Sequence, residues 1–319
     1  MRLPFFIEFD KSQAEWLVVA FESGDPAMIS AVEQGVDVHA WTAYRMSGLP
    51  IETILAEDRL LGKEDRVNRI AELRATLPDL AKAPWLPSGM SLRQAGKKSN
   101  HALNYDEGAM KFAQVNEMSV AEAKRLIALY HAAYPGIRKW HERIRFQLTA
   151  PWEDAAGRKR YRRTLLNCFG REMRFMGPLH GQGADTTFRA AYSCLPQSTV
   201  ADIASEAMIR VEAEMPTVTL KSNNHDSLLI QHYLNVDAFQ QINAQASEVS
   251  RILTEIERVI AFLDPILTSV YTGKTYRIRT DAKAGLCWGT LKAVQPTRDS
   301  VREMLLRVLR ENEEINADG

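Results

Sequence analysis

The chain has 319 residues, enough for one large domain or two smaller ones, and its 40 Lys and Arg balance its 40 Asp and Glu. Net charge therefore gives no nucleic-acid signal, and a DNA-binding surface would have to come from local clustering. The three cysteines lack metal-ligand spacing, and no apolar run suggests a signal peptide or a membrane span. We expect reduced thiols, a cytoplasmic location and no membrane partner.

Strand-like patterns lie early and late in the chain, and helical patterns lie between them. Residues 5–9 are apolar and predict a buried strand that ends at Asp10, and a helical pattern starts near Ser12. The remaining expected elements are helices over 91–104, 119–149 with a bend at Pro135, 185–213, 236–262 and from Pro296, a hairpin over 217–233, and a strand pair over 274–291 that ends near Trp288. This mixture predicts an α+β fold.

Two aspartates stand at the ends of apolar strands, Asp10 after residues 5–9 and Asp226 in the turn Asn224-His225-Asp226-Ser227. Taken singly, each is more simply a residue that caps a helix or a turn. Taken together, two strand-borne carboxylates can hold two Mg²⁺ ions for phosphoryl transfer. Two suffice, because Mg²⁺ prefers few carboxylates together with substrate phosphates.

The helix expected after residue 90 carries a cationic stripe. Arg93 and Lys97 are four residues apart and share a face, which His101 and Tyr105 continue. Two cations followed by two rings can grip a triphosphate and cover the base and sugar. Without further context, the simpler interpretation is a solvated stripe on a surface helix.

The densest basic cluster of the chain lies at residues 158–163, Arg-Lys-Arg-Tyr-Arg-Arg. Such a run can contact several DNA phosphates, which would make DNA binding salt-sensitive despite the zero net charge. A solvated surface turn explains the run equally well.

These motifs resemble those of the family A DNA polymerases, the polymerase I-like group. Asp10-x-Ser12-Gln13-x-Glu15 resembles motif A, Arg93 to Tyr105 resembles motif B, and His225-Asp226 resembles motif C. Further matches are Asp37-Val38-His39, the Tyr134 to Trp140 run, the helix that carries Arg189 and Gln197, and Trp288. The resemblance covers roughly residues 5–292.

The resemblance implies a role for each matching residue. Asp10 and Asp226 would be the catalytic carboxylates that hold the two Mg²⁺ ions, and Glu15 would exclude a ribose 2′-hydroxyl. The incoming dNTP would be bound by Arg93, Lys97, His39, Glu15, Gln13, His101 and Tyr105. Primer and template would be contacted by Arg189, Gln197 and His225.

Three positions depart from the family pattern. His101 stands where the family has Phe or Tyr, which affects discrimination against chain terminators. Asp106 stands where a glycine usually follows the tyrosine, so the geometry of the helix end is expected to differ. Ser227 replaces an auxiliary glutamate, and we expect this loss to be tolerated.

The resemblance also implies an organisation. We expect a palm with an antiparallel sheet and helical fingers, divided as palm 1–26, fingers 27–184 with an inserted helical segment 51–90, palm 185–295 and a C-terminal helical extension 296–319. Only nine residues precede Asp10, so thumb and exonuclease domains are expected to be absent and the edge of the 5–9 strand to be exposed. A second polypeptide would then supply the thumb and early palm, as in a phage-type split polymerase in the host cytoplasm. The segment 51–90 and the C-terminal helix are candidate docking elements.

The leading hypothesis is a DNA-templated DNA polymerase that acts on primer-template DNA and dNTPs in DNA replication. One alternative is a non-catalytic DNA-binding or assembly subunit that keeps the polymerase fold. Another is an RNA-synthesising relative, which would not be expected to carry Glu15.

Overall fold

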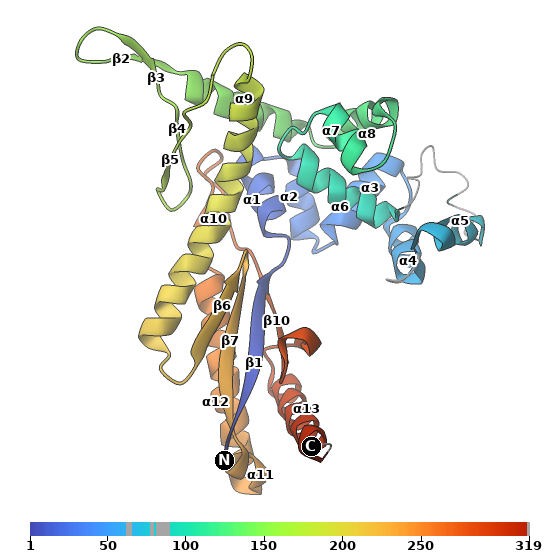
Figure 1. Ribbon diagram of the computed structural model, residues 1–319, viewed down its shortest axis with the longest axis vertical. Coiled ribbons are helices and arrows are strands. Elements are labelled where there is room, and N and C mark those ends of the chain that lie inside the picture. Colours follow the sequence, from blue (N-terminus) through green and yellow to red (C-terminus); the bar gives the residue numbers. More distant parts are fainter. Residues whose placement is uncertain (62–65, 77–79, 81–89, 318–319) are drawn as a thin grey trace. The chain divides into compact units, whose positions relative to one another are not determined.

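The computed structural model describes residues 1–61, 66–76, 80 and 90–317, which form two compact units (Figure 1). The first unit comprises Met1–Ala14, Ser198–Thr268 and Thr275–Gly319, and the second comprises Glu15–Gln197 and Ser269–Lys274. The chain therefore passes from the first unit to the second after residue 14, returns after residue 197, and enters the second unit again for Ser269–Lys274. The expected division into palm 1–26, fingers 27–184 and palm 185–295 stays a prediction. The C-terminal segment belongs to the first unit.

The first unit is built on a five-stranded antiparallel sheet in the order β11-β10-β1-β7-β6, which confirms the expected α+β fold. Its strands are β1 (Arg2–Lys11), β6 (Thr219–Asn224), β7 (Ser227–Asn235), β10 (Thr280–Gly285) and β11 (Lys292–Val294). β1 pairs with β7 on one side and with β10 on the other, and Phe5, Ile7 and Phe9 are fully buried. The expectation of an exposed β1 edge is therefore wrong, because β10 returns from late in the chain to cover it.

Helices α11 (Val236–Gln240), α12 (Ile242–Leu263) and α13 (Arg298–Ala317) complete this unit. The single helix expected over 236–262 is divided at Gln241, whose backbone is extended. α12 contacts β7, and α13 contacts β10 and β11. Val301, Leu305 and Val308 of α13 are buried. The C-terminal helix therefore packs on the sheet of its own chain.

The late strand pair differs in detail from the expectation. Trp288 lies on a short 3₁₀ helix (Trp288–Thr290) between β10 and β11 rather than at a strand end. Its indole Nε1 donates to Glu8 Oε1 at 3.0 Å. A separate two-stranded pair joins β8 (Leu267–Thr268) to β9 (Thr275–Tyr276).

The second unit is mainly helical. Its helices are α1 (Ala14–Ser23), α2 (Pro26–Glu33), α3 (Val38–Ser47), α4 (Ile51–Leu61), α5 (Arg66–Thr76), α6 (Leu92–Leu103), α7 (Ala109–Val115), α8 (Val120–Ala133) and α9 (Pro135–Thr149). The helix expected over 119–149 is two helices, because Tyr134 leaves the helical region and Pro135 starts α9. Of the expected inserted segment, residues 62–65, 77–79 and 81–89 lie outside the described residues.

Two small hairpins follow α9, β2 (Pro151–Glu153) with β3 (Lys159–Tyr161) and β4 (Thr164–Leu166) with β5 (Glu172–Arg174). The long helix α10 (Ala184–Glu214) comes next and matches the expected helix over 185–213. Across the described residues, none of the helices is both long and apolar enough to cross a membrane.

Candidate active site

The first unit brings the two predicted aspartates together, and we call Asp10 and Asp226 the carboxylate pair. Asp10 lies near the end of β1, and Asp226 lies in the two-residue turn between β6 and β7. Asp10 is opposite Ser227 in the β1–β7 ladder, and the Lys11 backbone N–H donates to the Asp226 carbonyl at 3.3 Å. Hydrogen-bonded strands thus fix the backbone of both aspartates.

Negative charge is concentrated around Asp10. Burial raises the pKa of the Asp10 carboxyl, and the negative charge of Asp226 raises it further. Asp281 lies opposite Asp10 on β10, and Glu8 lies two residues before it on β1. The ammonium of Lys283, 4.0 Å from Asp10 Oδ2, opposes these effects. A site with this excess of carboxylates favours binding of a cation.

The carboxylate pair fits magnesium chemically. The Asp10 side chain is 41% exposed, so its oxygens remain open to a ligand. Within the described residues, no group of three or more His, Cys, Asp or Glu side chains is arranged to enclose a metal. Mg²⁺ is commonly bound through one or two carboxylates, with waters and substrate phosphates as the other ligands. Asp10 and Asp226 suit that mode better than a closed protein cage.

Lys11, directly after Asp10, is a buried anchor that our sequence analysis did not single out. Its ammonium donates to the carbonyls of Leu263 and Ile278 and to Asp264 Oδ1, the last at 2.8 Å. Burial lowers the pKa of Lys11. These bonds fix the end of β1, and therefore the position of Asp10. An apolar run that ends in Asp-Lys does not reveal such long-range partners.

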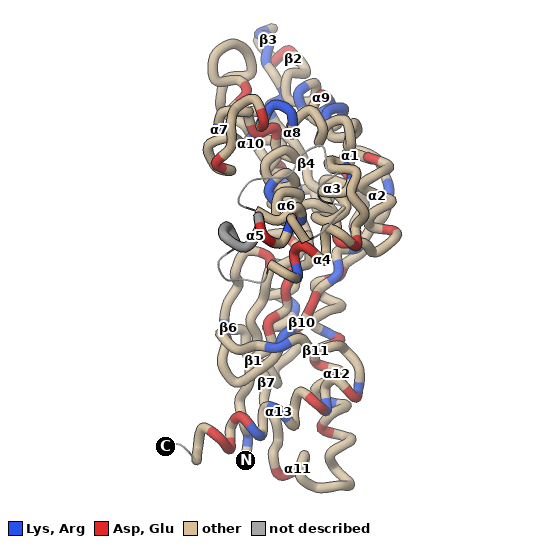
Figure 2. The backbone as a smooth tube through the Cα atoms, turned by 90° about the vertical axis from the view of Figure 1, so that its right-hand side faces the viewer, with Lys and Arg blue, Asp and Glu red and all other residues tan. Residues whose placement is uncertain are grey.

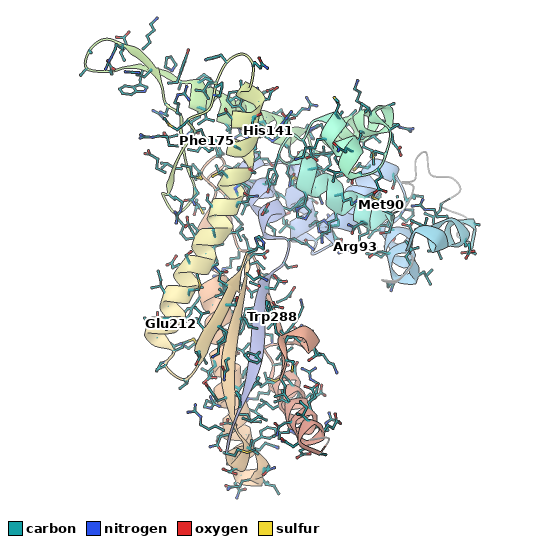
Figure 3. All side chains as sticks on the ribbon, viewed as in Figure 1. Met90, Arg93, His141, Phe175, Glu212 and Trp288 are labelled. Carbon is teal, nitrogen blue, oxygen red and sulfur yellow. The ribbon has the colours of Figure 1, made fainter. Side chains whose placement is uncertain are left out.

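The second unit carries the cationic helix α6. Ser91 caps its N-terminus by accepting from the Gln94 backbone N–H, and Arg93, marked in Figure 3, lies in its first turn. Arg93 donates from Nε and Nη2 to Asp37 Oδ2 at 3.0 and 2.7 Å. Asp37 Oδ1 in turn caps α3 by accepting from the His39 and Ala40 backbone N–H groups. One aspartate therefore links α3 to the cationic face of α6.

The structure groups His39 with the α6 face, which we define as Arg93, Lys97 and His101. His39 is buried, its Nδ1 lies 3.1 Å from Asn100 Nδ2, and its ring centroid lies 6.3 Å from that of His101. Burial lowers the pKa of His39 to about 4, and the positive charges of Arg93, His101 and Lys97 lower it too. His39 is therefore neutral near pH 7. Lys97 and His101 are exposed.

Gly96 is a functional position that the sequence analysis missed. A Cβ atom added there would lie 2.1 Å from the His39 carbonyl oxygen. Only a glycine allows α6 to approach α3 this closely, which is how His39 and the α6 face come together. A single glycine inside a helical pattern is the available signal.

Tyr105 lies beyond the end of α6 at Leu103, so it does not continue the helical stripe. Its hydroxyl donates to Glu15 Oε2 on α1, and burial and the Glu15 carboxylate raise the pKa of the phenol. Asp106 takes a φ of 59°, the left-handed conformation that a glycine would adopt freely. That the helix end differs from that of other family members stays a prediction.

The other predicted contact residues are spread over both units. Arg189 Nε donates to the Asp106 carbonyl at 2.8 Å, and Gln197 is exposed on α10. Gln13 and His225 both have left-handed backbones, with φ of 59° and 57°. Such conformations in residues other than glycine are strained and are common at functional sites. Ser227 is buried and donates to the Asn224 carbonyl, so a glutamate there would need a different environment.

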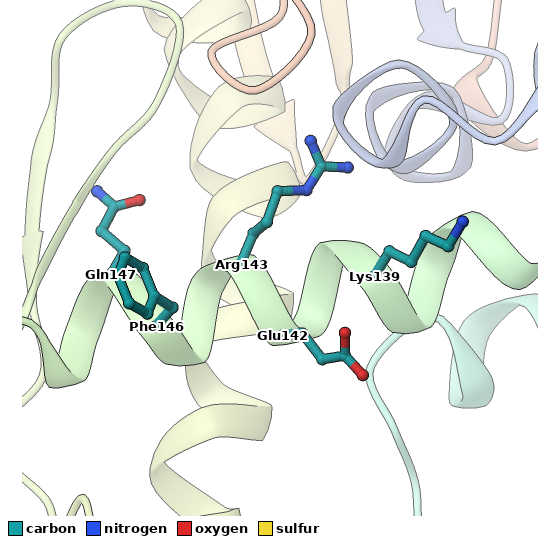
Figure 4. Close-up of a pocket in the computed structure, with 5 residues that line it drawn as sticks. All are labelled: Lys139, Glu142, Arg143, Phe146 and Gln147. Carbon is teal, nitrogen blue, oxygen red and sulfur yellow. The ribbon is translucent and has the colours of Figure 1, made fainter.

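A surface pocket on α9, drawn in Figure 4, contains none of the predicted site residues; it is lined by Lys139, Glu142, Arg143, Phe146 and Gln147. Arg143 Nη2 donates to the Ser23 carbonyl at 3.0 Å, and the Tyr271 hydroxyl donates to Gln147 Oε1 at 2.9 Å. Two of the lining residues therefore hold neighbouring segments of the unit together.

The family assignment follows from a comparison with known protein families. Residues 84–277, more than half of the chain, match the family model described as DNA polymerase family A. The chain belongs to DNA polymerase family A. The matched residues include α6, Asp226 of the carboxylate pair, and the strands β6 and β7 on either side of Asp226.

Bacterial members of the family are similar over most of the chain. DNA polymerase I of Deinococcus radiodurans is 26% identical over 274 residues, which cover 85% of this chain and 23% of that protein. The thermostable DNA polymerase I of Thermus thermophilus is 25% identical over 277 residues, covering 85% and 26%. The chain thus spans about a quarter of the length of these relatives.

A solved structure shows the same fold. The POL domain of Pol1 from M. smegmatis, in complex with DNA primer-template and dNTP, superimposes with a TM-score of 0.56. The match covers 89% of this chain and 40% of that one at 19% sequence identity.

Proposed function

We propose that this family A chain catalyses DNA-templated DNA synthesis, transferring a nucleotide from a dNTP to the 3′-hydroxyl of a primer. The observation that carries the proposal is the carboxylate pair, two aspartates held by neighbouring strands in a chain of this family. The first unit would act as the palm and the second as the fingers.

Asp10 and Asp226 would hold two Mg²⁺ ions through their carboxylates, whose mutual repulsion is relieved by a cation. When bound, such ions lower the pKa of the primer 3′-hydroxyl and neutralise the charge that develops on the leaving pyrophosphate. Lys11 keeps Asp10 in place, since its bonds to Leu263, Asp264 and Ile278 fix the backbone beside the carboxylate.

The α6 face would bind the triphosphate. Lys97 is exposed and offers a point charge, and Arg93 offers a planar guanidinium that is already oriented by Asp37. His39, neutral near pH 7, would contribute a hydrogen bond rather than a charge. His101 and Tyr105 would cover the base and sugar of the nucleotide, and Gln13 is a further residue proposed to bind the dNTP.

Glu15 would reject ribonucleotides by occupying the space of a 2′-hydroxyl. Tyr105 would hold the carboxylate in that position through its hydroxyl. Arg189, Gln197 and His225 would contact the primer and template, and Arg189 also supports the segment after α6 through the Asp106 carbonyl.

The two alternative functions are less well supported. A non-catalytic DNA-binding subunit would not need the carboxylate pair, the α6 face and Glu15 together. The departures at residues 106 and 227 do not favour loss of activity either, because Asp106 keeps a glycine-like backbone and Ser227 is satisfied within its turn. An RNA-synthesising enzyme would have no use for Glu15 as a barrier to the 2′-hydroxyl.

Primer-template DNA and dNTPs are the proposed substrates, and a cytoplasmic location remains a prediction. A second polypeptide that supplies the thumb and early palm also remains a prediction, which mass measurement of material from the native source would test.

Primer extension tests the proposed function. With Mg²⁺ and a primed template, we expect extension with dNTPs and little with NTPs. A protein that binds the primed template but extends it with neither substrate, with or without a chain supplying the thumb, would support the non-catalytic alternative. Preferential use of NTPs would support the RNA-synthesising one.

A further inference from the structure

The β2–β3 hairpin is an outlying element of the second unit. It follows directly after α9 and extends away from the helices (Figure 1). All six residues of its two strands are exposed, so it buries no core of its own. An isolated two-stranded hairpin is marginally stable in water, and this one carries charge rather than apolar packing. Packing within the hairpin therefore does not account for its side chains.

Charge is unusually concentrated here. Residues 151–163 contain five Lys and Arg but only two carboxylates, whereas the whole chain is balanced. Cations gather at β3 in Figure 2. One of the five is committed elsewhere, because Arg163 Nη1 donates to the carbonyls of Phe175 and Gly177. The others are exposed.

The register of the hairpin sorts its side chains onto two faces. Trp152 is opposite Arg160, and Pro151 is opposite Tyr161. Opposed residues in an antiparallel pair point to the same face, so Trp152 and Arg160 share one face and Tyr161 lies on the other. Tyr161 is already engaged there, since its ring lies 5.1 Å from that of His180. Trp152 is 53% exposed.

Asp154 orients two arginines on this hairpin. Its Oδ2 accepts from Arg158 Nε at 2.9 Å and from Arg160 Nε at 3.1 Å. The two arginine side chains are nevertheless 67% and 49% exposed. In the described part of the chain, no hydrogen bond engages their terminal Nη atoms. Two guanidinium groups are thus held in place with their outer donors free, which suits phosphate oxygens.

We propose that Trp152, Arg158 and Arg160, the Trp152 face, bind single-stranded DNA, with the indole stacking on a base and the arginines contacting the backbone. This combination of an exposed ring and cations is what sequence-independent single-strand binding requires. The proposal rests on the proposed function and deepens it, since the single strand of a polymerase substrate is the unpaired template.

The exposed indole distinguishes this ligand from others that cations attract. In a duplex the base faces are covered by their neighbours, so phosphate contacts alone would leave Trp152 without a role. An acidic protein surface would likewise use the arginines without requiring an aromatic ring.

Binding of the full chain to a labelled oligothymidine, followed by fluorescence anisotropy, tests the inference. Trp152→Leu should weaken binding by about tenfold, the effect of losing one stacked base, whereas Trp152→Phe should stay within about threefold of the parent. The double change Arg158→Gln and Arg160→Gln should reduce the slope of log K against log salt by about one or more. Arg210→Gln is the matched control, because Arg210 Nε meets Glu214 at 2.9 Å in an exposed pair on α10. It should change neither quantity.

Unchanged single-strand affinity in Trp152→Leu would overturn the inference, as would an equal loss of affinity for a blunt duplex. Equal losses in the Leu and Phe variants would also contradict stacking. Because the assay needs no nucleotide transfer, its outcome is separate from that of primer extension. If binding depends on Trp152 but the protein extends no primer, with or without a chain supplying the thumb, only the proposed function is contradicted. If the protein extends primers but its binding does not depend on Trp152, only this inference is contradicted.

Discussion

The hydroxyl of Tyr105 donates a hydrogen bond to the carboxylate of Glu15, which joins the segment after α6 to helix α1. If Glu15 excludes the 2′-hydroxyl, Tyr105 positions the group that does so. Glu15→Ala should lower the dNTP/NTP ratio of kcat/KM by about tenfold or more, a difference of about 1.4 kcal/mol between the two barriers. Tyr105→Phe, which keeps the ring, should lower it less.

Steady-state extension with dNTPs and NTPs measures both ratios. An unchanged ratio in Glu15→Ala would refute the steric role. A larger effect of Tyr105→Phe than of Glu15→Ala would show that the phenol itself discriminates.

Gly96→Ala should disturb the contact between α3 and α6. The added methyl group would lie 2.1 Å from the His39 carbonyl oxygen, so the helices must separate. We expect a loss of about 1–3 kcal/mol in the free energy of unfolding, as for other overpacked sites, and a raised KM for dNTPs. Gly289→Ala is the control, because no atom lies within 4 Å of a Cβ added there. Urea unfolding that is equal for both variants would contradict the close approach.

Arg93→Ala and Lys97→Ala should each raise the KM for dNTPs by about 10- to 100-fold, the cost of a lost hydrogen bond to a charged group. Duplex affinity should change much less. Lys98→Ala is the matched control, since Lys98 is on the same helix but outside the face shared by Arg93 and Lys97. A binding titration measures the affinity for duplex DNA. If that affinity falls as much as the use of dNTPs does, α6 contacts the DNA instead.

The second unit should lose stability in mild acid. Burial lowers the pKa of His141 to about 4. Burial is also the main reason why the pKa values of His39 and His131 are lowered to about 4. The unfolded chain protonates these rings near pH 6.5, so between about pH 6.5 and 4 it binds more protons than the folded chain, and stability falls as pH falls.

Urea unfolding at several pH values checks this. Each such histidine adds up to about 1.4 kcal/mol per pH unit to the slope of the free energy of unfolding against pH in that window. His141→Gln should therefore reduce this slope by up to that amount. A parent protein equally stable at about pH 7 and about pH 5 would contradict the burial of these rings.

Local patterns were enough to predict β1, the β6–β7 hairpin and α6, because the residues that mark each element lie close together in the chain. They could not predict that β10 covers the edge of β1, since the two strands are far apart in the chain. The dual role of Asp37, which caps α3 and binds Arg93, was hidden for the same reason. The break at Tyr134 was expected only as a bend in one helix, because a proline such as Pro135 can follow either a bend or the end of a helix.

The carboxylate pair is tested most directly by primer extension with Asp10→Asn and Asp226→Asn. These changes remove one negative charge each while keeping the side-chain shape, so the fold should persist and circular dichroism should match the parent. Asp281→Asn is the control, because Asp281 lies opposite Asp10 on β10 and adds to the same negative field without a proposed role as ligand. We predict that both members of the pair lose extension by at least about 10³-fold, because removing one charged ligand of a metal required in the transition state costs several kcal/mol. Asp281→Asn should stay within about tenfold of the parent. Activity in Asp10→Asn or Asp226→Asn as high as in Asp281→Asn would contradict the account.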